Sequence, residues 1–211
     1  MKLYHKIETL FKFNMETKKF DYGVYYNPNV EILKNNAWVF TEKIDGTNFR
    51  IYWNGHTLEY GGRTENSDFS NSQIEYIESN LVNEDYVNIF EQKFADKKVI
   101  VYGELYGVKI QNGGLYVGGS GLEFRVFDIE IEDIFLTWKN AEQLANELGY
   151  EYVPHALIGT IQEGIDFVLA NEISLFSSAK LEGLVGKPYG DFRDRLGKRI
   201  VVKIKRRDLM K

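Results

Sequence analysis

The chain has 211 residues, of which 44% are hydrophobic and 15% aromatic, and its formal net charge is −5. This composition indicates a packed globular protein rather than a disordered one, with enough length for one large domain or two small ones. No cysteine is present, which excludes a disulfide framework and a thiolate zinc site. No apolar run approaches the roughly 20 residues of a membrane span, and no signal-peptide pattern opens the chain. We therefore expect a cytoplasmic protein that makes no use of a membrane.

The charge is unevenly distributed along the chain. Residues 187–211 contain ten Lys or Arg and three Asp, a local charge of +7, so the other 186 residues carry −12. This polarity predicts a basic end that faces phosphate groups. A solvated terminal strand and tail would give the same pattern, and charge alone leaves both interpretations open.

The first strong pattern covers residues 37–62. These residues are rich in β-branched and aromatic side chains and are interrupted at 45–46 and at 54–55, which predicts a three-stranded meander. We expect Asp45-Gly46 to form a tight hairpin turn, because glycine adopts positive φ without steric cost. Lys43 would then be held beside a turn by two apolar strands.

The remaining elements alternate between helical and extended patterns. Apolar spacing predicts helices at residues 70–95, 139–148 and 162–170, and Thr137 is expected to cap the second of them. Extended segments are predicted at residues 7–13, 98–104, 124–129, 181–188 and 199–205, and the glycine-rich residues 107–121 predict a flexible turn.

The last predicted strand has a clear alternation. It places Lys203 and Lys205 on one face and Val202 and Ile204 on the other. Many short strands with a few helices predict an α+β fold built on antiparallel sheets. Because no repeat or clear linker is present, we expect a single domain over residues 1–211.

Lys43 is the candidate nucleophile. A lysine used in this way must be partly desolvated, held still, and able to lose its proton. Neighbouring cations favour the neutral amine, and Arg63, Lys187, Lys203 and Lys205 supply cations at strand ends or on strand faces. A lysine before an Asp-Gly turn is more often an ordinary solvated residue, so this motif alone does not decide.

Several short stretches carry these candidate residues in a fixed order along the chain. They are residues 42–49 around Lys43, 103–107 with Glu104, 124–129 with Phe127, 182–185 with Glu182, and 202–205 with Lys203 and Lys205. Together they resemble the motifs of the RNA ligase 2-like family, within the superfamily of ATP-dependent ligases and mRNA capping enzymes. Residues 4–11 also resemble the start of small, single-domain members, so the resemblance runs from about Tyr4 to Leu209.

The resemblance implies a fold and a set of catalytic roles. The fold would be a nucleotidyltransferase domain of mainly antiparallel sheets flanked by helices, with the nucleotide between the sheets. Lys43 would attack the α-phosphorus of ATP and become a lysyl-AMP. Lys203 and Lys205 would contact the α-phosphate, Lys187 would lie close by, and Glu182 would orient the nucleophile.

It also implies a nucleotide-binding set. Phe127 would stack on adenine, Glu104 would bind the ribose hydroxyls, and Glu42 would accept a hydrogen bond from the adenine amino group. Asn48 and Arg63 match positions around the phosphates and the nucleic-acid end. Glu104 and Glu182 are the carboxylates expected near Mg²⁺ or Mn²⁺, with Glu182 acting through water. We expect Arg206 and Arg207, in the basic end, to contact nucleic acid together with Arg63.

Each of these residues also has an ordinary structural interpretation. Phe127 fits core packing equally well, because strand alternation favours neither face. Lys203 and Lys205 fit the solvent face of an edge strand. Glu104 fits a surface ion pair, and Glu182 fits a turn residue before a glycine.

We expect an ATP-dependent RNA ligase that moves AMP from Lys43 to a 5′-phosphate and seals it to a 3′-hydroxyl. Two rivals remain open: a capping-type guanylyltransferase charged by GTP, and a non-catalytic protein that binds nucleic-acid ends. The substrate is RNA or DNA ends or nicks. The chain stops six residues after Lys205, so no C-terminal oligonucleotide-binding or helical domain is expected. Whether the chain ligates unaided or with an accessory protein in place of that domain stays open.

Overall fold

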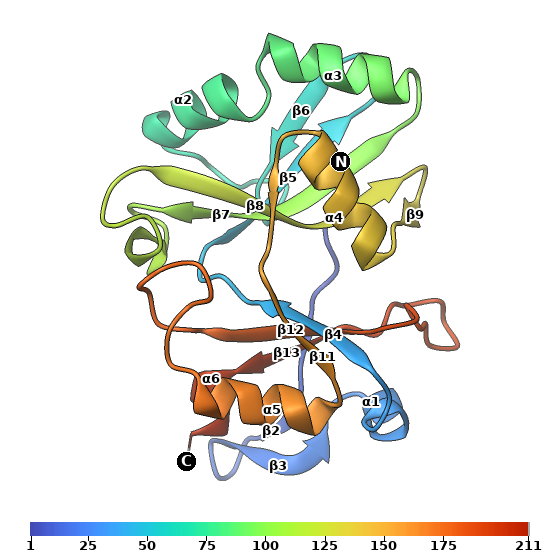
Figure 1. Cartoon of the computed structure of the whole chain (residues 1–211), viewed down its shortest axis with the longest axis vertical. Coiled ribbons are helices and arrows are strands. Elements are labelled where there is room, and N and C mark those ends of the chain that lie inside the picture. Colours follow the sequence, from blue (N-terminus) through green and yellow to red (C-terminus); the bar gives the residue numbers. More distant parts are fainter. Residues whose placement is uncertain (211) are drawn as a thin grey trace. The chain divides into compact units, whose positions relative to one another are not determined.

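The computed structural model describes residues 1–210, and their packing divides the chain into two compact units. Unit 1 contains residues 1–5 and 45–152, and unit 2 contains residues 6–44 together with those from 153 onwards. The architecture is mixed α+β, with mainly antiparallel sheets, as the sequence predicted. Each unit has its own sheet, and we describe the two in turn (Figure 1).

Unit 1 is built on a six-stranded sheet. Five strands follow the order β10-β8-β7-β5-β6, and β9 pairs with β8. Every pairing is antiparallel except β10 with β8. The strands are β5 (Thr47–Trp53), β6 (Leu58–Gly61), β7 (Val99–Gly107), β8 (Leu122–Ile131), β9 (Ile134–Phe135) and β10 (Glu151–Tyr152).

The helices of unit 1 agree with the sequence pattern. The predicted helical stretch 70–95 forms two helices, α2 (Asn71–Asn80) and α3 (Glu84–Phe94), which are drawn in green in Figure 1. The helix α4 (Trp138–Glu147) packs against β8, and the Thr137 side chain accepts from the backbone N–H of Asn140 as predicted. The glycine-rich stretch is a loop that contains one short 3₁₀ turn, η1 (Gly113–Leu115).

Unit 2 is built on a five-stranded sheet with the order β1-β13-β12-β4-β11. Only β1 and β13 pair in parallel. A separate two-stranded sheet, β2 with β3, adjoins it. The elements are β1 (Glu8–Thr9), β2 (Phe11–Asn14), β3 (Lys19–Tyr25), α1 (Pro28–Leu33), β4 (Trp38–Glu42), β11 (His155–Gly159), α5 (Ile161–Ala170), β12 (Gly183–Pro188), β13 (Val202–Lys205) and α6 (Arg206–Leu209).

One face of the unit 2 sheet is covered by α5. Phe40 of β4, Leu184 of β12 and Ile204 of β13 are fully buried in one cluster with Ile165 and Val168 of α5. The strand alternation predicted for residues 202–205 is therefore confirmed: Val202 and Ile204 enter this core. The intervening side chains of β13 must point to the opposite face of the sheet. That face carries the lysines.

The predicted hairpin at Asp45-Gly46 is wrong. β4 pairs with β11 and β12, whereas β5 pairs with β6 and β7, so the two flanking strands belong to different sheets. Only β5 and β6 form the predicted meander. Gly46 does not adopt positive φ either. It is required for a different reason: a Cβ built at this position would lie 2.5 Å from the backbone oxygen of Leu105.

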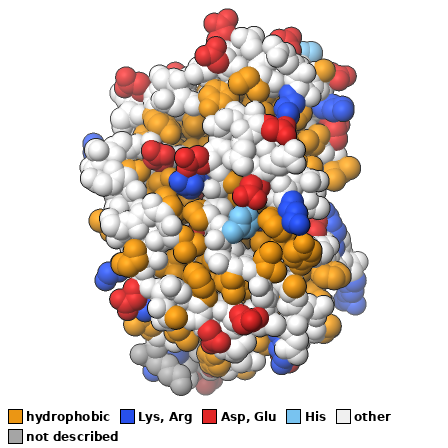
Figure 2. Space-filling model, in the orientation of Figure 1, with side chains coloured by type: hydrophobic (Ala, Val, Ile, Leu, Met, Phe, Trp, Pro, Cys, Tyr) orange, Lys and Arg blue, Asp and Glu red, His pale blue; other side chains and the backbone are white. Residues whose placement is uncertain are grey.

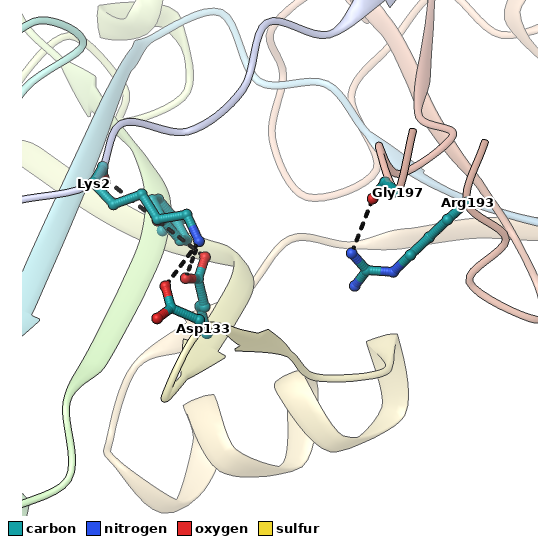
Figure 3. A network of polar contacts seen from close by, with 6 residues as sticks. Lys2, Asp133, Arg193 and Gly197 are labelled. Carbon is teal, nitrogen blue, oxygen red and sulfur yellow. Dashed lines mark hydrogen bonds and ion pairs between the residues drawn. The ribbon is translucent and has the colours of Figure 1, made fainter. Parts of the chain in front are cut away.

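Charged contacts fasten two peripheral segments. In unit 1, the ammonium of Lys2 bonds a carboxylate oxygen of Glu130 at 2.5 Å and one of Asp133 at 3.2 Å (Figure 3). In unit 2, Arg193 donates to the carbonyl of Gly197 at 3.2 Å and closes the loop before β13 (Figure 3). Among the residues that the structure describes, no helix has the length and apolarity needed to cross a membrane.

Candidate functional site

Unit 2 brings Lys43 and Lys205 onto the same carboxylate. Lys43 Nζ lies 2.5 Å from Glu182 Oε2, and Lys205 Nζ lies 2.6 Å from Glu182 Oε1. The three side chains are 22%, 15% and 16% exposed, in the order Lys43, Lys205, Glu182. The carboxylate thus pairs with two cations at once, which leaves a net charge of +1, and it fixes both amines while the three side chains stay partly exposed.

The backbone explains why Glu182 sits between the two lysines. The carbonyl of Gly183 accepts from the N–H of Lys43, and the carbonyl of Glu182 accepts from the N–H of Arg206, both at 2.9 Å. β12 therefore runs between the ends of β4 and β13, with Gly183 opposite Lys205. Only glycine fits at position 183, since φ is +155° and a Cβ would lie 2.0 Å from the backbone oxygen of Ile204.

Lys203 adds a third cation to the same face of the sheet. Burial lowers its pKa below the ordinary lysine value, and the positive charges of Lys205 and Lys43 lower it further. Lys187 lies on β12 opposite Val39 and is 9% exposed. Four lysines from three adjacent strands thus form a cationic surface suited to phosphate groups, with Glu182 as its counter-charge.

Glu42 is buried at the end of β4, immediately before Lys43. Because Glu42 directly precedes Lys43, their side chains point to opposite faces of the sheet. Its carboxylate is buried, with the residue 2% exposed, and Oε2 accepts from the backbone N–H of Leu175 at 2.7 Å. This contact ties β4 to the segment that leads into β12. The contact of Glu42 with adenine stays a prediction.

In unit 1, Asn48 and Glu104 are neighbours on two adjacent strands of the sheet. They are register partners on β5 and β7, and Arg125 on β8 is the partner of Glu104 on its other side. A Cβ at position 46 would lie 2.9 Å from Glu104 Cγ, so the bare backbone of Gly46 is what leaves room for this carboxylate. Glu104 is half-buried.

Phe127 lies in a β-bulge, which explains why alternation could not place it. Tyr102 is opposite Asp128, but Gly103 is opposite Val126, so Phe127 is the extra residue of β8. Its ring is half-buried and meets the ring of Tyr4 edge-on, with centroids 4.9 Å apart. Bulges re-aim a side chain, and here the result is a ring that is neither core nor fully solvated.

The three arginines expected at nucleic acid differ from one another. Arg63 is exposed in the loop after β6, in unit 1. Arg207 is 77% exposed on α6, with Asp208 as its ion-pair partner at 3.6 Å. Arg206, in contrast, turns inward and donates to the carbonyls of Val168 at 2.5 Å and Asn171 at 2.7 Å. Its guanidinium closes the C-terminal end of α5, and a nucleic-acid contact stays a prediction for all three arginines.

Two residues near the site escaped the sequence analysis. Arg125, next to Glu104, donates to the hydroxyl of Tyr106 at 3.1 Å. Asp208 lines a small cleft together with Lys203 and Lys205. Burial raises the pKa of its carboxyl, although the charges of Arg207, Lys205 and Lys203 act against the rise. The only signal in the sequence was that each lies two or three residues from a motif residue.

The carboxylates of the site are dispersed. Among residues 1–210 no group of three or more His, Cys, Asp or Glu side chains is arranged to hold a metal ion. Glu182 bridges Lys43 and Lys205, and Asp208 lines the cleft beside Lys203 and Lys205. Carboxylates spread out in this way suit a cation that keeps most of its water, such as Mg²⁺, rather than a fully dehydrated one.

Comparison with known proteins adds a family and a fold. The family model described as RNA ligase matches residues 36–205. A mutant of Naegleria gruberi RNA ligase with ATP and Mn superposes with a TM-score of 0.62 and 24% identity, covering 95% of this chain and 59% of that one. The same ligase with PPi gives a TM-score of 0.63 at 24% identity, and a mutant with AMP and Mn gives a TM-score of 0.61 at 22% identity. Each of these matches covers 95% of this chain and 59% of the other.

These structural matches show a shared fold at low identity. The chain spans 59% of the length of the Naegleria ligase. No curated protein matches it in sequence.

Proposed function

Because the chain belongs to the RNA ligase family, we propose that it is an ATP-dependent RNA ligase that works through a covalent lysyl-AMP intermediate. The observation that carries the proposal is the pair of contacts from Lys43 and Lys205 to one carboxylate, Glu182. The Naegleria structures with ATP, AMP, PPi and Mn support the choice of nucleotide and metal.

In the first step the neutral amine of Lys43 attacks the α-phosphorus of ATP. A P–N bond forms, the bond to the bridging oxygen breaks, and pyrophosphate leaves. Lys43, which lies beside the cations Lys203 and Lys205, must first give up a proton, because only the neutral amine carries the lone pair that attacks. The same cations stabilise the charge that develops on the α-phosphate. Glu182 holds the amine in place until the nucleotide arrives.

In the second step a 5′-phosphate oxygen of the polynucleotide attacks the AMP phosphorus. The P–N bond breaks, Lys43 is released, and a 5′–5′ pyrophosphate linkage forms. In the third step a 3′-hydroxyl attacks the polynucleotide phosphorus, loses its proton, and AMP leaves. Lys43 has no covalent part in this last step, whereas Lys205 would still stabilise the phosphate charge.

Nucleotide recognition would use unit 1. We assign Phe127 to the adenine ring, Glu104 to the ribose hydroxyls and Asn48 to the phosphates. A ring held at a bulge with an exposed part is suited to stacking, and Glu104 is held against the bare backbone of Gly46. A Mg²⁺ or Mn²⁺ ion would neutralise phosphate charge, with Glu182 of unit 2 as a carboxylate near it, through water.

A joining assay tests this division of labour. Wild type should join an ordinary 5′-phosphate strand with ATP, and should also join a pre-adenylylated strand without ATP. Lys43→Ala should retain only the second reaction, and Lys205→Ala should lose both. If wild type joins the pre-adenylylated strand and Lys43→Ala does not, Lys43 acts in the last step and this scheme is wrong.

Two controls separate the rivals. A labelled adduct with GTP in place of ATP would identify a capping-type enzyme, and binding of ends without any adduct would identify a non-catalytic protein. If wild type takes up AMP and joins neither strand, the chain needs an accessory protein for the joining steps.

A further inference from the structure

The segment ahead of the matched family region carries an unusual surface. The family model begins at residue 36, so the two-stranded sheet of β2 and β3 lies outside it. Large apolar side chains stand exposed on this sheet and just after it. They are Phe13 (45%), Met15 (69%), Tyr22 (55%), Val24 (46%) and Tyr26 (47%). Three of the five are aromatic.

Lysines accompany these rings. Lys12, Lys18 and Lys19 are all exposed on β2, on the turn and on β3. One nearby acid, Asp21, is engaged by the side-chain amide of Asn14 at 3.2 Å. Rings interleaved with lysines are the arrangement that binds single-stranded nucleic acid, because bases stack on the rings and the cations contact the phosphates.

The charge of the two units points the same way. Unit 2 contains 17 Lys or Arg against 12 Asp or Glu, a net of +5. Unit 1 contains 9 against 19, a net of −10. A polyanion is therefore attracted to unit 2, which holds both Lys43 and the β2–β3 sheet. A partner that needed only an apolar surface would not require this asymmetry.

The β2–β3 sheet is also continuous with the lysine cluster inside unit 2. One cleft is lined by Phe11 and Phe20 of this sheet together with Lys203, Lys205 and Asp208. The short helix α6, which carries the exposed Arg207, packs against β3. Figure 1 shows β2, β3 and α6 together near the C-terminus, and Figure 2 shows hydrophobic side chains reaching the surface among scattered charges.

We propose that the exposed side of the β2–β3 sheet, with Arg207 beside it, is a platform for a single-stranded stretch of the polynucleotide. The bases stack on Phe13 and Tyr26, and Lys18, in the turn between the two strands, and Arg207 contact the phosphates. Lys19 is the register partner of Asn14 and so lies on the face opposite Phe13. The strand then reaches Lys203 and Lys205 along the cleft. This inference rests on the proposed function for its substrate, and it adds a place where that substrate is held.

The test is binding of a fluorescent single-stranded RNA to the full chain without ATP, followed by anisotropy. Phe13→Leu with Tyr26→Leu removes two rings but keeps apolar surface, and should weaken binding about ten- to a hundredfold. Lys18→Gln should weaken binding and lower the salt slope by about 0.7. The matched control is Lys97→Gln with Lys98→Gln, an adjacent exposed lysine pair in unit 1, which should bind like wild type.

Lysyl-AMP formation, measured on the same variants, keeps the two proposals distinct. The platform variants should still take up AMP from ATP, because they leave Lys43 and its partners untouched. If wild type binds RNA and the platform variants bind equally well, the platform is wrong while the ligase proposal stands. If wild type takes up no AMP but the ring and lysine variants lose RNA binding, the ligase proposal fails and the platform stands. If wild type fails to bind RNA at all, the platform is wrong. If the leucine pair binds RNA like wild type while the lysine variant binds it more weakly, the surface attracts phosphate by charge alone, and the stacking on Phe13 and Tyr26 is wrong.

Discussion

Replacing Arg206 by alanine should destabilise the protein by about 2–4 kcal/mol. The guanidinium donates to the carbonyls of Val168 at 2.5 Å and Asn171 at 2.7 Å, at the C-terminal end of α5. A hydrogen bond to a charged group contributes roughly 1.5–3 kcal/mol. Both short bonds come from one nitrogen, and the side chain is 18% exposed. The expected loss of stability is therefore smaller than the sum of two separate hydrogen bonds. The ion pair of Arg206 with Glu172 adds little, since that partner is 76% exposed.

The assay is thermal unfolding of Arg206→Ala beside Arg207→Ala. For a chain of this size, 2–4 kcal/mol corresponds to a fall in Tm of roughly 5–15 °C. Arg207 is 77% exposed and should change Tm by about 1 °C or less, while weakening RNA binding. An Arg206→Ala protein that melts like wild type and loses RNA binding would refute the structural role of this arginine.

Three further predictions concern the site. Gly46→Ala should cost about 1–3 kcal/mol of stability and impair ATP use, because the added Cβ would lie 2.5 Å from the Leu105 oxygen; unchanged unfolding and activity would contradict it. Phe127→Leu should raise the ATP concentration needed for adduct formation about tenfold with little change in Tm, whereas a lower Tm with unchanged ATP use would make it a core residue. The pKa of Lys203 is lower in the folded chain than in the unfolded chain, so the unfolded chain holds this proton more tightly. The charged lysine therefore destabilises the fold at neutral pH, and this penalty is relieved as the pH rises toward 10.5. Lys203→Met should therefore raise Tm at pH 7, by an amount that shrinks toward pH 10, while activity is lost; a lower Tm at pH 7 would show that the lysine supports the fold.

Local signals explain most of what the sequence predicted correctly. Thr137 caps α4 because its hydroxyl reaches a free N–H two to three residues on, which needs no knowledge of the rest of the fold. The faces of β13 follow from its two-residue period, so Lys203 and Lys205 could be placed together. The motif order then brought Glu182 to the same lysines, and the contacts at 2.5 and 2.6 Å agree with that grouping.

What could not be predicted depends on contacts distant in sequence. Asp45-Gly46 has the composition of a hairpin turn, but β4 finds its partners in β11 and β12, more than 100 residues later. Phe127 could not be placed because a bulge resets the alternation of β8. Arg206 belongs to a basic run, yet it meets the end of α5, which no nearby residue announces.

The central claim is that Lys43 carries AMP. The most direct test is the intact mass of the purified protein after incubation with ATP and Mg²⁺, compared with Lys43→Arg, which keeps the charge but cannot supply a neutral amine. The account predicts a gain of one AMP on wild type, reversed by added pyrophosphate, and no gain on the variant. An adduct of the same mass on folded Lys43→Arg, or none on wild type at any metal concentration tried, would contradict it.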